Sequence, residues 1–249
     1  GGAGLYFTKW VPSPGRRYTR QVVEAAVQKS LTRMQTDALD LMQFHWWDYN
    51  DDEYLRVMQS MQELQSEGKI RNLALTNFDT ERMEVMAAAG ITLASNQVAY
   101  SILDRRPAVR MAPFCARHGC KLLTYGTLLG GLLSESFIGR GRSTNPGTSQ
   151  GKYLDWIDAW GGWELFQELL RVLKGVGDKH GVEIAQVAIR WVLDQPQVGG
   201  VIVGARLGIS QHVSENLRAL DLRLDEADFA AIEAVVGKGR PLRGEPGDE

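Results

Sequence analysis

The feature that most constrains the fold is a regular alternation of short apolar runs with longer segments of helical periodicity. The apolar runs, which predict buried strands, cover residues 5–10, 39–45, 73–77, 92–98, 121–125 and 201–203. The segments with helical spacing cover residues 19–34, 54–65, 80–89, 109–118, 163–179, 184–193, 210–220 and 225–236. Since no hairpin signal separates the runs, the pattern predicts parallel strands joined by right-handed helical crossovers.

The number of strands limits the architecture further. Six strands are two fewer than the eight of a closed (β/α)8 TIM barrel, so we expect an α/β barrel that lacks two strand-helix units. Exposed strands at the gap would favour self-association. With 249 residues, 44% of them hydrophobic, the chain can fill one core, and we expect a single domain over residues 1–249.

Two segments depart from the alternation. Residues 127–162 are rich in glycine and serine and predict a long loop, and the tail from Gly237 predicts a flexible end. Because specificity in α/β folds lies in loops, we expect Trp46, Trp47 and Trp160 to form an aromatic wall of a substrate pocket.

Composition argues against several kinds of partner. The formal net charge is -2, and no basic stretch suggests a nucleic-acid groove. No apolar run reaches the roughly 20 residues that span a bilayer, and no leader segment is recognisable, so we expect a soluble intracellular protein. Cys115 and Cys120 lack a second pair at ligand spacing, which predicts free thiols and no metal site.

Polar side chains end five of the predicted strands. They are Lys9, His45, Asn77, Gln97 and Tyr125. One such residue alone is usually a surface or packing residue. Five at strand ends predict a functional rim, because the carboxyl ends of parallel barrel strands form one face. Tyr6 is an odd number of residues from Lys9, so on a regular strand the two side chains point to opposite faces.

The strand-end residues lie in motifs that resemble the aldo-keto reductase family, in family order, from Leu5 to about Val236. The motifs are Phe7-Thr8-Lys9, Leu39-Asp40-Leu41-Met42-Gln43-Phe44-His45-Trp46-Trp47-Asp48, Glu67-Gly68-Lys69-Ile70-Arg71, Leu75-Thr76-Asn77-Phe78, Ser95-Asn96-Gln97-Val98, Leu123-Thr124-Tyr125-Gly126-Thr127-Leu128, Val203-Gly204-Ala205-Arg206 and Ser214-Glu215-Asn216. The double tryptophan and the stretch Asp158-Ala159-Trp160-Gly161-Gly162-Trp163 look most like plant or algal members.

The resemblance implies a reductase of aldehydes or ketones that uses NADP(H). Lys9 matches the catalytic lysine and His45 the catalytic histidine. Asn77 and Gln97 match the residues that bind the nicotinamide carboxamide, and Tyr125 matches the aromatic residue that stacks on the nicotinamide ring.

Further cofactor contacts follow from the same resemblance. The segments concerned contain Gly126, Leu128, Gly204, Arg206, His212, Glu215 and Asn216. Arg206 lies in the segment that approaches the adenosine 2′-phosphate, and Glu215 and Asn216 resemble the pair that contacts the adenine. His212 stands where the family usually has a basic residue. This replacement weakens the preference for NADP over NAD without removing it.

The sequence departs from the family upstream of Lys9. The tyrosine that protonates the carbonyl and the aspartate that pairs with the lysine belong to the first two strand-helix units, which we expect to be absent here. An N-terminally truncated enzyme accounts for this, as does a barrel completed by a partner chain. Another account is a catalytically impaired NADP(H)-binding regulatory or scaffolding module. An aldolase-like barrel with Lys9 as a Schiff-base nucleophile leaves Asn77, Gln97 and Tyr125 unexplained. We expect the protein in the cytoplasm or a plastid, and the sequence does not distinguish the two.

Overall fold

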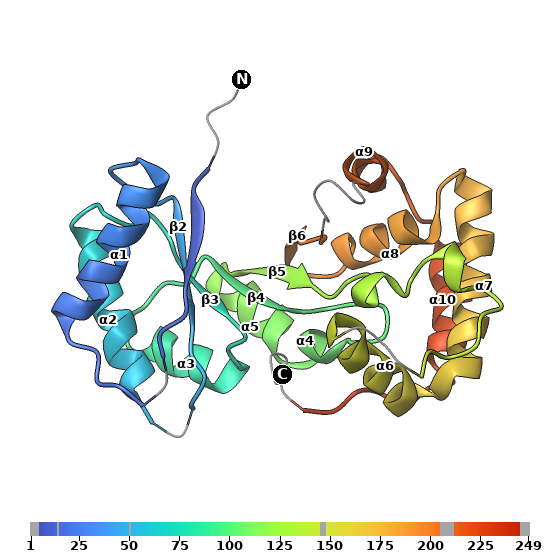
Figure 1. Cartoon of the computed structure of the whole chain (residues 1–249), viewed down its shortest axis with the longest axis horizontal. Coiled ribbons are helices and arrows are strands. Elements are labelled where there is room, and N and C mark those ends of the chain that lie inside the picture. The colour runs from blue at the N-terminus through green and yellow to red at the C-terminus, as the bar shows by residue number, and fades with distance from the viewer. Residues whose placement is uncertain (1–4, 14, 50, 145–147, 205–211, 245–249) are drawn as a thin grey trace. The chain divides into compact units, whose positions relative to one another are not determined.

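A computed structural model describes residues 5–13, 15–49, 51–144, 148–204 and 212–244 (Figure 1). The described strands form one six-stranded sheet in the order β1-β2-β3-β4-β5-β6, which confirms the predicted number of strands. The strands are β1 (Phe7–Trp10), β2 (Leu41–His45), β3 (Leu73–Thr76), β4 (Ser95–Ala99), β5 (Lys121–Tyr125) and β6 (Val198–Val201). Parallel pairing joins β1 to β2, β2 to β3 and β3 to β4, as the alternation predicted.

Helices follow most of the strands. They are α1 (Arg20–Met34), α2 (Glu53–Ser66), α3 (Thr80–Ala88), α4 (Arg106–Val109), α5 (Met111–His118), α6 (Thr148–Trp160), α7 (Gly162–His180), α8 (Ile184–Leu193), α9 (Val213–Leu217) and α10 (Glu226–Val236), with short 3-10 turns η1 (Leu129–Gly131), η2 (Glu135–Phe137) and η3 (Arg218–Leu220). The chain divides into two compact units. Within the described residues, the first unit extends to Val98 and adds residues 110–122, whereas the second comprises Ala99–Val109 and Leu123–Gly244.

In the first unit, strand register fixes which side chains face the helices. Lys9 lies opposite Gln43, and Trp10 lies opposite Phe44. The rings of Trp10 and Phe44 are 5.9 Å apart, and Trp10 also packs edge-on against Tyr18, which precedes α1. Because successive residues of a strand point to opposite faces, Lys9 and Gln43 lie on the face turned away from this aromatic contact.

The helix-facing side of the first unit is an aromatic core. Phe44 contacts Trp46 and Phe78, with centroids 5.7 and 5.8 Å apart, and both Phe44 and Phe78 are completely buried. Trp46 is 3% exposed and donates its indole N–H to the carbonyl of Asp48. Trp46 therefore belongs to the core, and its expected place in a pocket wall is wrong.

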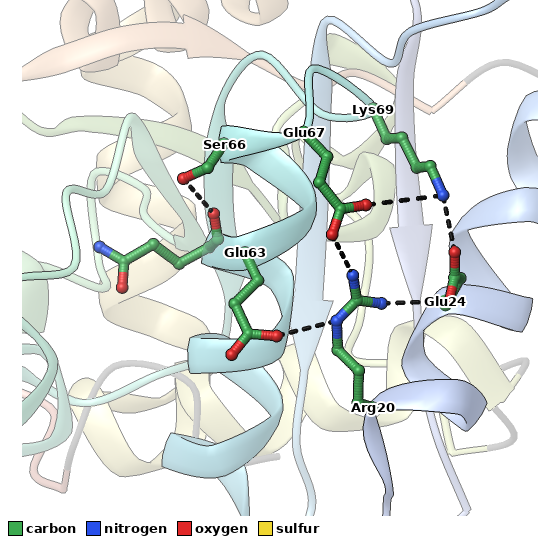
Figure 2. Close-up of polar contacts among 7 residues, drawn as sticks. Arg20, Glu24, Glu63, Ser66, Glu67 and Lys69 are labelled. Atoms are coloured by element: carbon green, nitrogen blue, oxygen red, sulfur yellow. Dashed lines mark hydrogen bonds and ion pairs between the residues drawn. The ribbon is translucent and has the colours of Figure 1, made fainter.

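Charged side chains join α1 to α2 on the outer surface of the first unit (Figure 2). Arg20 forms ion pairs with Glu24 at 3.3 Å, with Glu63 at 2.8 Å, and with Glu67. Lys69 completes the network with Glu24 at 2.7 Å and Glu67 at 3.7 Å. Hydrogen bonding to Lys69 holds the pKa of Glu24 below its usual value. Because this network is exposed to solvent, it helps to orient the two helices but contributes little to the free energy of unfolding.

The second unit contains the largest departure from the predicted secondary structure. The expected loop over residues 127–162 holds η1, η2 and the helix α6. Within α6, Leu154, Ile157 and Trp160 recur at helical spacing, and each is at most 1% exposed. This apolar stripe packs against the protein and stabilises a helix despite the glycines and serines before it. Trp160 is a core residue that donates to the carbonyl of Val236, so its assignment to a pocket wall is also wrong.

Other boundaries differ by a few residues. The helix expected over residues 109–118 is α5, and a separate short helix, α4, precedes it. The last strand lies at Val198–Val201, earlier than expected. Residues just beyond α10 are anchored, since the amide of Arg240 donates to the carbonyl of Trp160 and Lys238 pairs with Glu168 at 2.5 Å. The prediction of a flexible tail from Gly237 is therefore wrong for residues 237–240.

No helix in the described part of the chain is both long enough and apolar enough to span a bilayer.

A buried carboxylate, that of Asp228, ties α7 to α10. Asp228 is 3% exposed and accepts hydrogen bonds from Lys179 Nζ at 2.8 Å and from the amide of Asp225 at 3.0 Å, and it pairs with His180 Nε2 at 2.7 Å. Burial raises the pKa of Asp228, but these hydrogen bonds outweigh burial and lower the pKa from 3.8 to about 2.

We predict that Asp228→Asn lowers the free energy of unfolding at pH 7 by about 2 kcal/mol, the value that corresponds to this pKa shift. Because the pKa of the folded state is depressed, the stabilisation is present above about pH 4 and is lost as the pH falls toward 2. Chemical denaturation across this pH range measures it. Asp221→Asn, at an exposed aspartate of the same unit, is the matched control. A constant difference between wild type and Asp228→Asn down to pH 2 would contradict the prediction.

Candidate functional site

Four of the predicted site residues lie at the carboxyl ends of neighbouring strands in the first unit. Lys9 is in β1, His45 ends β2, Asn77 follows β3, and Gln97 is in β4. The register places His45 opposite Thr76, and Thr76 opposite Gln97. Since partners opposite each other point to the same face, His45, Thr76 and Gln97 lie side by side on the face that carries Lys9 and Gln43.

Lys9 and Gln97 are in direct contact. The ammonium group of Lys9 donates a hydrogen bond to Oε1 of Gln97, and the Thr76 hydroxyl donates to the same oxygen at 3.4 Å. Lys9 is exposed, whereas Gln97 is only 8% exposed. The two donors fix which way the Gln97 amide points, because a carbonyl oxygen must face them. The amide N–H2 of Gln97 is thereby turned away from Lys9.

His45 is held beside an exposed tryptophan. His45 is 8% exposed, and its ring centroid lies 4.3 Å from that of Trp47, at an interplanar angle of 35°. Trp47 itself is 52% exposed. Of the three tryptophans expected to line a pocket, Trp47 alone has an accessible ring next to a predicted catalytic residue.

Asn77 adopts an unusual backbone conformation at the end of β3. Its φ is 58°, in the left-handed region that asparagine tolerates better than most residues. The amide of Asn77 donates to the carbonyl of Gln97 at 2.9 Å, and its own carbonyl accepts from the Tyr49 hydroxyl at 2.7 Å. Tyr49 packs edge-on against Phe78 and lies under the guanidinium of Arg82, 5.2 Å from its ring centroid. Tyr49 thus fixes the turn that presents Asn77.

Two buried polar groups on the same face escaped the sequence interpretation. Gln43 and Ser95 are two residues before His45 and Gln97, so the strand period of two could have found them. Nε2 of Gln43 and Oγ of Ser95 are buried and have no hydrogen-bond partner among the residues that the structure describes. Buried donors of this kind usually mark a functional or water-binding site, because leaving them unpaired costs free energy.

The second unit holds Tyr125 and the residues that follow it. The amide of Tyr100 donates to the carbonyl of Tyr125 at 3.0 Å, and the Thr127 hydroxyl donates to the carbonyl of Tyr100 at 3.1 Å. Gly126 has a φ of 71°, and a Cβ there would lie 3.1 Å from the Tyr153 hydroxyl oxygen. Both the backbone and the close approach of Tyr153 therefore require glycine at this position.

The remaining predicted cofactor residues are distributed as follows. Leu128 precedes η1 and is half-buried, and Gly204 lies in an exposed segment where a Cβ would meet nothing within 4 Å. His212 is exposed and precedes α9, which contains Glu215 and Asn216. Hydrogen bonds from its own backbone amide and from Ser214 lower the pKa of Glu215. Arg206 lies outside the described residues, so the expected contact with a 2′-phosphate stays a prediction.

The two cysteines are free and buried, as predicted. Within the described part of the chain, no group of three or more histidine, cysteine, aspartate or glutamate side chains is arranged to hold a metal ion.

Comparisons with known proteins agree with this arrangement of strands. A model of the Aldo/keto reductase family matches residues 5–236. Flagellar radial spoke protein 5 of Chlamydomonas reinhardtii is 33% identical over 184 residues, which are 64% of this chain and 34% of that protein. Aldo-keto reductase YhdN of Bacillus subtilis is 32% identical over 197 residues, or 77% of this chain and 56% of that protein. The chain thus spans between one third and just over half of the length of these two relatives.

Solved structures show the same fold. Aldo-keto reductase AKR11C1 from Bacillus halodurans, in its holo form, superposes with a TM-score of 0.74 at 23% identity, covering 98% of this chain and 75% of that one. An aldo/keto reductase from Klebsiella pneumoniae in complex with NADP and acetate gives a TM-score of 0.69 at 23% identity, covering 98% of this chain and 72% of that one.

We predict that Tyr49→Phe lowers the free energy of unfolding by about 1 kcal/mol, because the change removes one hydrogen bond and leaves the carbonyl of Asn77 without the Tyr49 hydroxyl. Denaturant titration of the variant measures the loss. Tyr6→Phe is the matched control, since the Tyr6 side chain is 42% exposed. Equal stability of Tyr49→Phe and wild type would show that this hydroxyl does not hold the Asn77 turn.

Proposed function

Since the chain belongs to the aldo/keto reductase family, we propose that it is part of an oxidoreductase that reduces an aldehyde or ketone to an alcohol with NADP(H). The observation that carries the proposal is the contact between Lys9 and Gln97, on a face that also holds His45. This arrangement combines a cation, an imidazole and an oriented amide at the carboxyl ends of parallel strands, where barrel enzymes place their sites.

The polar groups of the first unit fit the nicotinamide carboxamide. That group has one carbonyl acceptor and two N–H donors, and recognition needs donors and acceptors of both kinds. Because Oε1 of Gln97 accepts from Lys9 and Thr76, its N–H2 group is the part available to donate to a carboxamide oxygen. The Asn77 side chain, 5% exposed, supplies a second amide held by the Tyr49 turn. By family resemblance, Tyr125 stacks on the nicotinamide ring, and Arg206, His212, Glu215 and Asn216 contact the adenosine half.

When bound, NADPH supplies the hydride. The chain's own contribution is positive charge and hydrogen-bond donors beside the carbonyl oxygen, which becomes negative as the carbonyl is reduced. By family resemblance, the proton that completes the alcohol comes from the tyrosine of the strand-helix units that precede Lys9 in the family. Lys9, positioned by Gln97, stabilises that charge, and His45 orients the carbonyl oxygen through its ring N–H. The exposed ring of Trp47, next to His45, forms the apolar side of the substrate position.

A second candidate function has its own support. The relative that is 33% identical is a flagellar radial spoke protein. A catalytically impaired NADP(H)-binding subunit with a regulatory or scaffolding role would keep the amide groups of Asn77 and Gln97 without needing a proton donor. The two candidates differ in turnover and agree in cofactor binding.

We predict that NADPH binds the chain and that its fluorescence changes on titration, with NADH as the comparison for the 2′-phosphate. An unchanged fluorescence with both NADPH and NADH would contradict cofactor binding, which both candidate functions require.

We further predict that Lys9→Met lowers kcat/KM for reduction of a simple aromatic aldehyde by at least about 100-fold, the usual contribution of charge stabilisation and proton transfer. Lys29→Met, at an exposed lysine of α1, is the matched control. Spectrophotometry of NADPH consumption measures the rate. Turnover that Lys9→Met leaves unchanged would refute the role of Lys9, and NADPH binding without turnover in the wild type would favour the second candidate.

A further inference from the structure

Three aromatic rings in the second unit surround one lysine. Nζ of Lys152 lies 5.4 Å from the ring centroid of Tyr125, 5.5 Å from that of Tyr153 and 5.4 Å from that of Trp156. An ammonium group within about 6 Å of a ring face is attracted by the ring quadrupole. One cation placed at similar distances from three rings has the geometry of an aromatic cage, the arrangement that binds quaternary ammonium ligands.

The cage is built by a helix and a strand end. On α6, Trp156 lies four residues after Lys152 and three residues after Tyr153, so its side chain neighbours both of them on the helix surface. The rings of Tyr153 and Trp156 are perpendicular, with centroids 5.3 Å apart. Tyr125 ends β5, and Gly126 admits the Tyr153 hydroxyl where any larger residue would displace it. The walls therefore depend on packing between α6 and the end of β5, not on the helix alone.

A buried ion pair supports the wall formed by Trp156. The guanidinium of Arg106 lies 5.3 Å from the Trp156 ring centroid. Arg106 is held in turn by Asp104, which is completely buried, through Nε to Oδ1 and Nη2 to Oδ2 contacts of 2.8 Å each. The charge of Arg106 is matched by that carboxylate, so the guanidinium acts as a fixed support for the ring.

We propose that Tyr125, Tyr153 and Trp156 form a cation-binding cage, which Lys152 occupies as an internal ligand and from which a pyridinium cation displaces it. We identify the displacing cation as the oxidised nicotinamide ring. This identification rests on the proposed function, because that function places the ring against Tyr125. Displacement makes Lys152 a competitor of the cofactor. Its ammonium must leave the cage before a flat cationic ring can stack there, and the repulsion between two cations weakens binding of the oxidised form most.

The experiment uses 1-methylnicotinamide, a pyridinium cation without the rest of the cofactor, and neutral nicotinamide as its uncharged counterpart. Isothermal titration calorimetry compares the wild-type chain with Lys152→Met, which removes the charge and keeps an unbranched apolar side chain. We expect about tenfold tighter binding of 1-methylnicotinamide to Lys152→Met, the size of one desolvated cation–π contact, and no matching gain for nicotinamide. Lys152→Gln is a second variant in case Lys152→Met does not fold.

The matched control is Lys174→Met on α7. Lys174 pairs with Asp178 and is not one of the cage residues. Equal affinity of wild type and both Lys152 variants for 1-methylnicotinamide would overturn the proposal, and so would the same gain in Lys174→Met, which would reflect net charge alone.

Titration with NADP+ then separates this inference from the proposed function. Tighter binding of NADP+ to Lys152→Met than to wild type supports displacement by the nicotinamide ring. Equal binding of NADP+ to both overturns displacement by the cofactor, although the proposed function stands. Selective gain for 1-methylnicotinamide with no binding of NADP+ to either protein supports the cage and refutes the proposed function.

Discussion

The alternation of side chains along parallel strands is the constraint on which the rest of the first unit depends. Strands β1 to β4 pair in one continuous register. The register that turns Trp10 and Phe44 toward the helices therefore turns the alternate side chains to the other face of the sheet. These alternate side chains are Lys9, Gln43 and His45. A shift of one residue in β1 would turn Lys9 toward the aromatic core, and the same shift in β2 would turn Phe44 away from it. The aromatic core therefore fixes the register, and the register assembles the polar residues of the candidate site.

The same constraint explains the hydrogen bonds of that site. Lys9 and Gln97 are 88 residues apart in sequence, yet the register brings them to one face, where the ammonium fixes the orientation of the amide. The position of Asn77 depends instead on a left-handed turn that the Tyr49 hydroxyl holds by a hydrogen bond. The site thus combines a rigid part, set by strand pairing, with a turn set by one side-chain hydrogen bond. Membership of the aldo/keto reductase family agrees with a nicotinamide ligand for this arrangement, although the chain spans only about a third to just over half of the length of its first two curated relatives.

Much of this arrangement could be predicted from sequence because strands and strand ends carry local signals. The six apolar runs matched six strands. His45 ends β2 and Asn77 follows β3, as predicted, whereas Lys9 and Gln97 lie within β1 and β4. Features that depend on tertiary contact were missed. Trp46 carries no local sign that it is buried. α6 follows a glycine-rich stretch but is stabilised by burial of Leu154, Ile157 and Trp160. The cage around Lys152 joins α6 to the end of β5, a pairing that no spacing in the sequence reveals.

Hydrogen–deuterium exchange with and without NADPH tests most directly whether the carboxyl ends of these strands bind a nicotinamide cofactor. We predict that NADPH slows exchange in peptides that contain the ends of β2, β3, β4 and β5, including His45, Asn77, Gln97 and Tyr125, and leaves exchange unchanged in the α1–α2 surface around Arg20. Protection confined to regions away from the strand ends, or no protection at saturating NADPH, would contradict it.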